Sequence, residues 1–347
     1  MKNFVSIDSF LKKGAILSLS RDLFVLGWGE LSANASCQGA GFFKQNFDLS
    51  ESRPWRVFSN YSYLSKDELR EFMERVPIQP GQNKRQWSSA IFSEFENKFI
   101  RIQDHIQMGK ISKAVPVTYE SSEGCLTSFE ISHFITRALK TSDSNYLYGY
   151  WDDEGGVLGL TPEVLFRKNG KNLFSMALAG TKESHCSASL LNDEKEIFEH
   201  RLVVEEMDKA LMDLGQNTWG KTEEQCVGSL THLKTEVNCI LQSEFSFDQI
   251  VAQLHPTPAL GVFPKKSNLN WFLTEVSDSA RGIFGAPFGF QSNLSEGFCI
   301  VAIRNLYWDG RQTKLYSGCG IVEKSQIKKE WKELEVKRNS VKQMLGL

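Results

Sequence analysis

The sequence predicts an α+β fold, in which strands come in runs and a few long helices separate those runs. Short apolar segments between 146 and 180 alternate with turns that contain Gly or Asp, as they do in an antiparallel meander. Apolar residues recur at helical spacing over 91–106, and a long helix is expected at 194–213. No GxGxxG or Walker pattern follows any strand, so a βαβ nucleotide-binding fold lacks support.

Each element has a local signal in the sequence. Strands at 15–20 and 23–29 flank Arg21 and Asp22 and suggest a hairpin. Pro116 removes a hydrogen-bond donor from the strand at 111–117, which we therefore expect at a sheet edge or with a bulge. The remaining elements are helices at 66–76, 91–106 (ended by Gly109) and 194–213, strands at 146–151, 157–160, 164–168, 172–180, 298–305 and 313–322, and a C-terminal helix that carries 330–337.

A polar stretch that contains proline, 77–82, is the best candidate for a boundary within the chain. It separates a strand-rich N-terminal portion, 1–84, from a main portion, 85–347. We expect both portions to pack into the same domain.

Composition excludes several classes of protein. A chain of 347 residues with 41% hydrophobic residues can bury a large core, and its net charge of -2 argues against nucleic-acid binding. The sequence contains no run of eighteen consecutive apolar residues, so we expect no membrane-spanning helix. Seven scattered cysteines without a CxxC pair are typical of reduced thiols. The sequence therefore predicts a soluble, cytoplasmic protein.

Two helices carry carboxylates at helical spacing. Glu330, Glu333 and Lys337 share one face of the last helix, and Glu196 and Glu199 repeat the spacing in 192–207. Two such faces can hold a hard divalent cation such as Mg²⁺ between them. The alternative is that both are ordinary solvated faces.

Two ionisable residues, Lys113 and Glu163, occur at positions where packing of the predicted strands does not explain them. Lys113 lies inside an apolar strand, either as a charged residue that protects a sheet edge or as a buried base. Glu163 follows Pro162 at a corner between strands, either as a solvated carboxylate or as a partly desolvated acid that donates a proton.

Glycine-rich segments form a further candidate site. GIFGAPFGF (282–290) and SGCG (317–320) are either tight turns or backbone that approaches an anion. Arg304, expected within the apolar strand at 300–305, needs a carboxylate from the protein or from a ligand.

Together these motifs resemble those of the chorismate-utilising enzymes. In chain order they are Lys113 in ISKAV, Glu163 in TPE, LAGT (178–181), KEIFEH (195–200), HPTPALGVFP (255–264), RGIFGAPFG (281–289), VAIR (301–304), SGCGIV (317–322) and EWKELEVK (330–337). The resemblance implies a single α+β domain with two large, mostly antiparallel sheets packed together and helices outside. It assigns 85–347 as the chorismate-binding catalytic part.

Particular residues distinguish the members of this family. Members that use water as the nucleophile have a lysine at the position of Lys113, whereas aminodeoxychorismate synthases have a nucleophilic lysine at the position of Ala179. HPTPA (255–259) is typical of isochorismate synthases. The resemblance thus implies an isochorismate synthase, which is an isomerase. A salicylate synthase and a non-catalytic chorismate-binding protein are the alternatives.

The resemblance also implies roles for individual residues. Lys113 would activate water for attack at C2 of chorismate, and Glu163 would protonate the departing C4 hydroxyl. The ligands of Mg²⁺ would be Glu199 and Glu333, with Glu196 and Glu330 beside them. The substrate would be held by Gly180, Thr181, Arg304, Gly318, Gly320 and Lys337.

Some features stay open at this level. The product can feed menaquinone, a siderophore or salicylate, and menaquinone is favoured because the chain shows no carrier domain. A monomer is the default expectation. Thr118, Cys319 and Ile283 stand where the family usually has arginine, alanine and tryptophan.

Overall fold

The computed structural model describes residues 6–77, 85–140, 145–184, 188–277 and 281–347. The α-helices are α1 (Ile7–Lys12), α2 (Lys66–Met73), α3 (Phe92–Gln107), α4 (Ser128–Ala138), α5 (Glu194–Met212), α6 (Phe247–Leu254), α7 (Lys265–Glu275) and α8 (Ile327–Leu345), with a 3-10 turn at Leu190–Asn192. The strands are β1 (Gly14–Ser18), β2 (Leu23–Asn34), β3 (Gly41–Lys44), β4 (Trp55–Ser65), β5 (Lys113–Ala114), β6 (Val117–Glu123), β7 (Tyr146–Asp152), β8 (Gly155–Thr161), β9 (Val164–Asn169), β10 (Asn172–Glu183), β11 (Gly215–Trp219), β12 (Glu223–Val227), β13 (Leu230–Leu241), β14 (Val262–Phe263), β15 (Pro287–Asn293), β16 (Glu296–Val301), β17 (Asn305–Asp309) and β18 (Gln312–Gly318).

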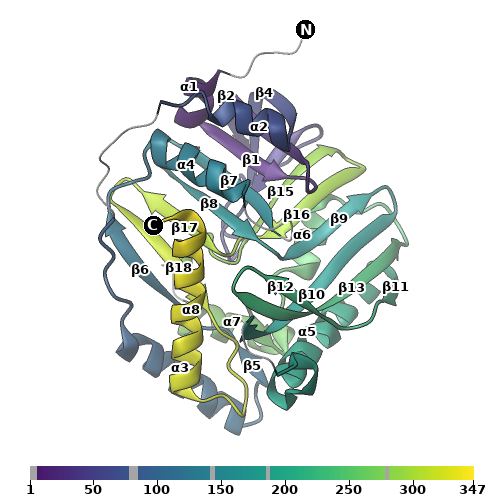
Figure 1. Ribbon diagram of the computed structural model, residues 1–347. Coiled ribbons are helices and arrows are strands. Elements are labelled where there is room, and N and C mark those ends of the chain that lie inside the picture. The colour runs from purple at the N-terminus through teal and green to yellow at the C-terminus, as the bar shows by residue number, and fades with distance from the viewer. Residues whose placement is uncertain (1–5, 78–84, 141–144, 185–187, 278–280) are drawn as a thin grey trace.

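The strands form one long antiparallel ladder. Its order is β11-β13-β10-β9-β16-β15-β3-β4-β2-β1-β7-β8-β17-β18-β6, with β12 beside β13, and β5 pairs separately with β14. The ladder curls so that distant strands face each other: the rings of Tyr148 on β7 and Phe288 on β15 are 5.4 Å apart. The α+β class is confirmed. The two expected sheets are the two facing halves of a continuous path (Figure 1).

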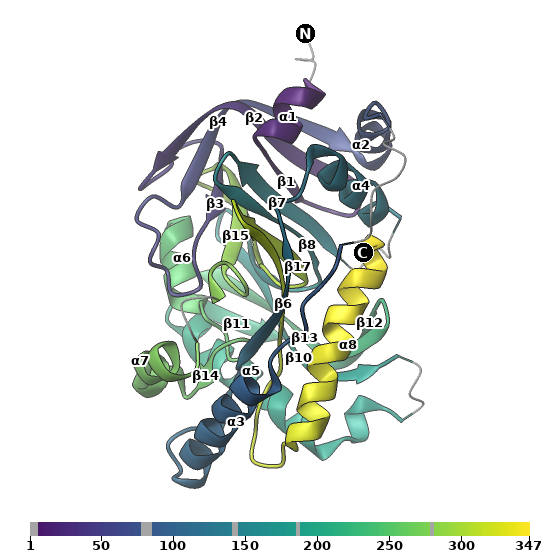
Figure 2. The same cartoon turned by 90° about the vertical axis from the view of Figure 1, so that its left-hand side faces the viewer.

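The N-terminal strands are part of this ladder. β1 and β2 form the predicted hairpin, and together with β3 and β4 they occupy the middle of the path, between β15 and β7. Helices α1 and α2 pack on β1, β2 and β4, and α4 packs against both helices (Figure 2). Apolar side chains of these elements belong to a second core. The stretch expected as a boundary lies, except for Pro77, outside the described residues, so the division at 84/85 stays a prediction.

Two long helices flank the part of the ladder that carries the site. α5 packs on β10 and β11, while α8 lies along β18 and also contacts α3 (Figures 1 and 2). Asp193 caps α5, because its carboxylate accepts hydrogen bonds from the backbone N–H groups of Lys195 and Glu196. The cap fixes where α5 begins and therefore which of its side chains face α8.

Three local expectations need correction. The strand expected at 111–117 is divided: β5 ends at Ala114, and β6 begins after Pro116 as an edge strand of the ladder. The strand expected at 298–305 ends at Val301, and Arg304 has φ of +53° in the connection to β17. The strand expected at 313–322 ends at Gly318. As a result, Lys113 lies in the separate β5–β14 pair, while Arg304 and Gly320 lie outside the strands.

Two further observations concern the predicted class of protein. Among the described residues, no helix is both long enough and apolar enough to cross a membrane. None of the cysteines within the described ranges forms a disulfide bond.

Candidate active site

An enclosed pocket lies where β8, β10, β13 and the end of β18 meet α5 and α8. Most of the residues expected to bind or transform a substrate line it. The lining comprises Pro162, Glu163, Leu178, Ala179, Gly180, Thr181, Glu199, His232, Ala259, Leu260, Phe284, Ile303, Arg304, Tyr316, Ser317, Gly318, Gly320, Lys337 and Val341. Its free volume is about 80 Å³, below the roughly 300–1,000 Å³ of typical ligand pockets. Substrate access therefore requires side chains to move.

Lys113 reaches this pocket through Glu199. The lysine is fully buried on β5, and its Nζ lies 2.8 Å from Glu199 Oε1. No hydrogen bond with favourable angles accompanies this ion pair among the described residues. Burial opposes ionisation of Glu199, but the charges of Lys113 and Lys195 outweigh it and lower the pKa of that carboxyl group. Complete burial excludes the solvated edge position considered for Lys113.

The close approach of backbone to this ion pair depends on Gly320. A Cβ atom there would overlap Glu199 Oε1 and lie 2.8 Å from Lys113 Cε. The second glycine of SGCG therefore leaves the space that this ion pair occupies, and a side chain at 320 would displace the pair.

Glu163 is the candidate acid. It stands between β8 and β9, after Pro162, and is buried. Burial raises its pKa to about 7, and nearby cations, first among them Lys113, offset that rise only in part. With a pKa of about 7, a substantial fraction of this carboxyl group is protonated near neutral pH and can donate a proton, as the sequence interpretation required.

The predicted carboxylates of α5 and α8 face each other across a lysine. The Nζ atom of Lys195 lies 3.0 Å from Glu196 Oε1 and 3.0 Å from Glu330 Oε1. On α8, Lys337 Nζ lies 2.7 Å from Glu333 Oε1 and donates a hydrogen bond to the Gly318 carbonyl at 2.8 Å. The structure therefore brings together the two rows of carboxylates, the ridges, that α5 and α8 carry. Glu196 and Glu330 are buried, which excludes the alternative that both helix faces are ordinary solvated surfaces.

The carboxylate cluster of α5 and α8, called the cradle below, consists of Glu196, Glu199, Glu330 and Glu333. Its oxygen donors are of the kind that suits Mg²⁺. Glu330 Oε2 is buried without a hydrogen-bond partner in the described structure. Burial and then the charge of Glu199 raise the pKa of Glu196 to about 7. Carboxylate oxygens are the ligands that Mg²⁺ prefers. Yet within the described ranges no three Asp, Glu, His or Cys side chains converge closely enough to hold a metal ion.

His232 is a site residue that sequence reasoning missed. Its Nε2 lies 2.6 Å from Arg304 Nη2, and its Nδ1 lies 3.2 Å from the Gly180 carbonyl oxygen. Because arginine can only donate, Nε2 accepts and the proton is on Nδ1. Burial and then Arg304 lower the pKa of His232 well below its usual value, so the ring stays neutral.

A bulge in β10 explains the LAGT motif. The register between β10 and β13 shifts at Gly180, which has φ of +76°, and the Thr181 N–H then donates to Glu196 Oε2 at 2.8 Å. The same bulge turns the Gly180 carbonyl toward His232. Nothing local in the sequence links 180 with 232; only the pairing of Thr181 with His232 across two strands does so.

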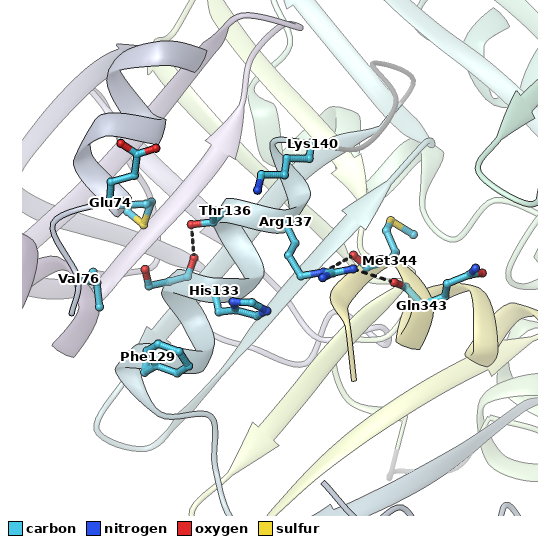
Figure 3. Close-up of a pocket in the computed structure, with 11 residues that line it drawn as sticks. Glu74, Val76, Phe129, His133, Thr136, Arg137, Lys140, Gln343 and Met344 are labelled. Atoms are coloured by element: carbon cyan, nitrogen blue, oxygen red, sulfur yellow. Dashed lines mark hydrogen bonds between the residues drawn. The ribbon is translucent and has the colours of Figure 1, made fainter. Parts of the chain in front are cut away.

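A second, larger hollow lies away from these residues. It has a volume of about 680 Å³ and is bounded by α2, α4 and the last turn of α8 (Figure 3). Its polar groups include Arg137, which donates to the carbonyls of Gln343 and Met344. Glu74 is its one acidic side chain among the described residues, and none of the residues expected to act on a substrate lines it. The smaller pocket is therefore the candidate active site.

A model of the family described as "Chorismate binding enzyme" matches residues 42–346. The chain belongs to this family. Relatives include the isochorismate synthases MenF of Bacillus subtilis, 28% identical over 231 residues (62% of this chain and 48% of the relative), and MenF of Haemophilus influenzae, 29% identical over 242 residues (67% and 56%). The chain thus spans about half the length of these curated relatives.

Solved structures show the same fold. The putative isochorismate synthase DhbC from Bacillus anthracis aligns with a TM-score of 0.79 at 18% identity, over 98% of both chains. MenF from Escherichia coli aligns with a TM-score of 0.78 at 19% identity, over 99% of this chain and 92% of the other. Because the match to DhbC extends over nearly the whole length of both chains, the N-terminal strands belong to the family fold.

Proposed function

We propose that this chorismate binding enzyme is an isochorismate synthase, which adds water at C2 of chorismate and releases the C4 hydroxyl group. The observation that carries the proposal is a pocket lined by a buried acid, Glu163, and by cations that suit a dicarboxylate. A buried amine, Lys113, lies behind Glu199 of this lining and interacts electrostatically with Glu163. The relatives named as isochorismate synthases support it.

The pocket offers the anionic substrate two cations. Arg304 and Lys337 line it together with the backbone at Gly180, Gly318 and Gly320. The hydrogen bond from Arg304 to His232 fixes the direction of the guanidinium. A fixed guanidinium recognises a carboxylate through two parallel hydrogen bonds. These groups would bind and orient the carboxylates of chorismate.

Lys113 and Glu163 would move the protons. In its neutral form, once the ammonium of the ion pair with Glu199 has lost a proton, the Lys113 amine would accept a proton from the attacking water. The protonated Glu163 carboxyl group would donate a proton to the C4 hydroxyl, which leaves as water, so one hydroxyl group replaces another and the overall change is an isomerisation. Each positioned proton transfer contributes about 10²–10⁴-fold. Mg²⁺, which Glu199 and Glu333 with Glu196 and Glu330 would hold, would supply charge neutralisation for a substrate carboxylate.

The pH dependence of the reaction tests the role of Glu163. The acid form is required, and burial raises its pKa to about 7, so this form dominates below pH 7 and is lost above it. We expect kcat/KM at saturating Mg²⁺ to decrease as pH rises through about 7. In Glu163→Gln the residual activity should lack this descending limb. An unchanged limb in the variant would assign it to another group.

The reaction product tests the function itself. Purified protein incubated with chorismate and Mg²⁺ is expected to form isochorismate, measured by HPLC, and EDTA should abolish the reaction. Salicylate and pyruvate as products would instead show a salicylate synthase. Chorismate binding without turnover would show a non-catalytic member of the family.

Finer features belong to the same proposal. We place the product in menaquinone biosynthesis, because two of the relatives are MenF proteins. A cytoplasmic monomer is the form in which we expect the enzyme to act.

A further inference from the structure

Lys195 is the cation that joins the two carboxylate ridges. It is the second residue of α5, and its Nζ lies at the same distance, 3.0 Å, from Glu196 on its own helix and Glu330 on α8. Within the described ranges, no other lysine is ion-paired with a carboxylate from each helix. Lys113 pairs with Glu199 of α5, and Lys337 pairs with Glu333 of α8.

The geometry points to Lys195 as a tethered counter-cation whose ammonium takes the position between α5 and α8 that a divalent cation requires, so that metal binding must displace it. This inference rests on the proposed function, since it concerns the Mg²⁺ site of that reaction. In this inference Lys195 controls whether Mg²⁺ occupies the site, although Lys195 is not itself a metal ligand.

Charge and space both support displacement. Mg²⁺ binds carboxylate oxygens at about 2.0–2.1 Å. An ammonium 3.0 Å from Glu196 and Glu330 oxygens would then lie only a few ångströms from the dication, where like charges repel strongly in a buried site. While Lys195 spans the gap, no three carboxylates of the described chain converge on one point. The two arrangements are mutually exclusive.

Lys195 can leave more easily than Lys113, because its side chain is 22% exposed whereas that of Lys113 is completely buried. The side chain of Lys337 is also 22% exposed, but its ammonium donates a further hydrogen bond to the Gly318 carbonyl. Asp193 and Glu194, which precede Lys195 at the start of α5, are exposed, so a displaced ammonium would enter a solvated region that carries further carboxylates. The expected consequence is a site whose carboxylates are always neutralised, by the lysine or by the metal.

Metal affinity provides the first test. Isothermal titration of Mg²⁺ into Lys195→Met should give a Kd at least tenfold lower than in the wild type. The matched control is Lys324→Met, because Lys324 is exposed and pairs with Glu194 without contacting the cradle. That control removes the same unit charge near the same helix end, and solvent screening should limit its effect to less than about twofold.

Amine labelling of the wild-type protein provides the second test and does not depend on a variant that folds. Acetylation by acetic anhydride, measured by mass spectrometry, should increase at Lys195 when Mg²⁺ is added and stay constant at Lys324. Thermal unfolding adds a third readout: in EDTA, Lys195→Met should have a lower Tm than the wild type, and Mg²⁺ should raise that Tm more than it raises the wild-type value.

The outcomes separate the two proposals. Mg²⁺ binding with equal Kd in wild type and Lys195→Met, or unchanged labelling of Lys195 at saturating Mg²⁺, would overturn the displacement while leaving the metal site intact. Absence of Mg²⁺ binding in both proteins would overturn the metal requirement of the proposed function, and the displacement with it. Product analysis with chorismate remains an independent measure of the reaction.

Discussion

Replacing Lys113 with Gln is expected to reduce kcat/KM for chorismate by about 10²–10⁴-fold, the usual contribution of a positioned base. Gln cannot accept a proton at this position, and it leaves Glu199 without its ion-pair partner at 2.8 Å. The charges of Lys195 and Lys337 still act on Glu199, so the fold should persist. Steady-state kinetics with HPLC detection of isochorismate, together with the Tm, measure both effects.

The control for this variant is Lys110→Gln. Lys110 is exposed and lies three residues before Lys113, outside the pocket. It should retain wild-type kinetics within about twofold, since exposed charges contribute little. Near-normal turnover in Lys113→Gln would refute the assigned role, whereas loss of activity in both variants would indicate damage to the segment before β5.

Replacing Gly320 with Ala is expected to reduce kcat/KM by about 10²-fold or more. The added methyl group would overlap Glu199 Oε1 and press on Lys113 Cε, so the ion pair has to move. A displacement of about 1 Å at reacting groups is enough for a loss of that size. The Kd for Mg²⁺ should also rise, because Glu199 is a proposed ligand.

Gly310→Ala is the matched substitution for this test. It lies in the turn between β17 and β18, and no atom outside its immediate neighbours lies within 4 Å of the added Cβ. Its kinetics and Tm should stay close to those of the wild type. Wild-type kinetics in Gly320→Ala as well would show that the crowded contact has no part in catalysis.

The local sequence pattern predicted most helices and strands, because hydrophobic periodicity and turn residues act over only a few neighbouring positions. The helical spacing at 194–213 corresponds to α5 (Glu194–Met212), and the meander at 146–180 corresponds to β7–β10. The sequence was wrong where backbone departs from regular structure. Pro116 divides a strand, and Arg304 adopts a left-handed conformation that an apolar run does not reveal.

The sequence motifs predicted which residues belong to the candidate site, whereas the packing of the elements determines how these residues come together. Glu196 with Glu199, and Glu330 with Glu333, could be recognised as two ridges because helical spacing is a property of neighbouring residues. Their approach to each other across Lys195 could not, since it depends on how α5 and α8 pack on one ladder.

The sequence by itself determined the elements, the family motifs and the types of chemical group available. The tertiary structure decided which groups meet: Lys113 with Glu199, and His232 with Arg304 and Gly180. The physical reason is that spacing along a chain fixes direction only within one helix or strand. Contacts between elements depend on packing, and packing also decides burial, which sets the pKa of Glu163.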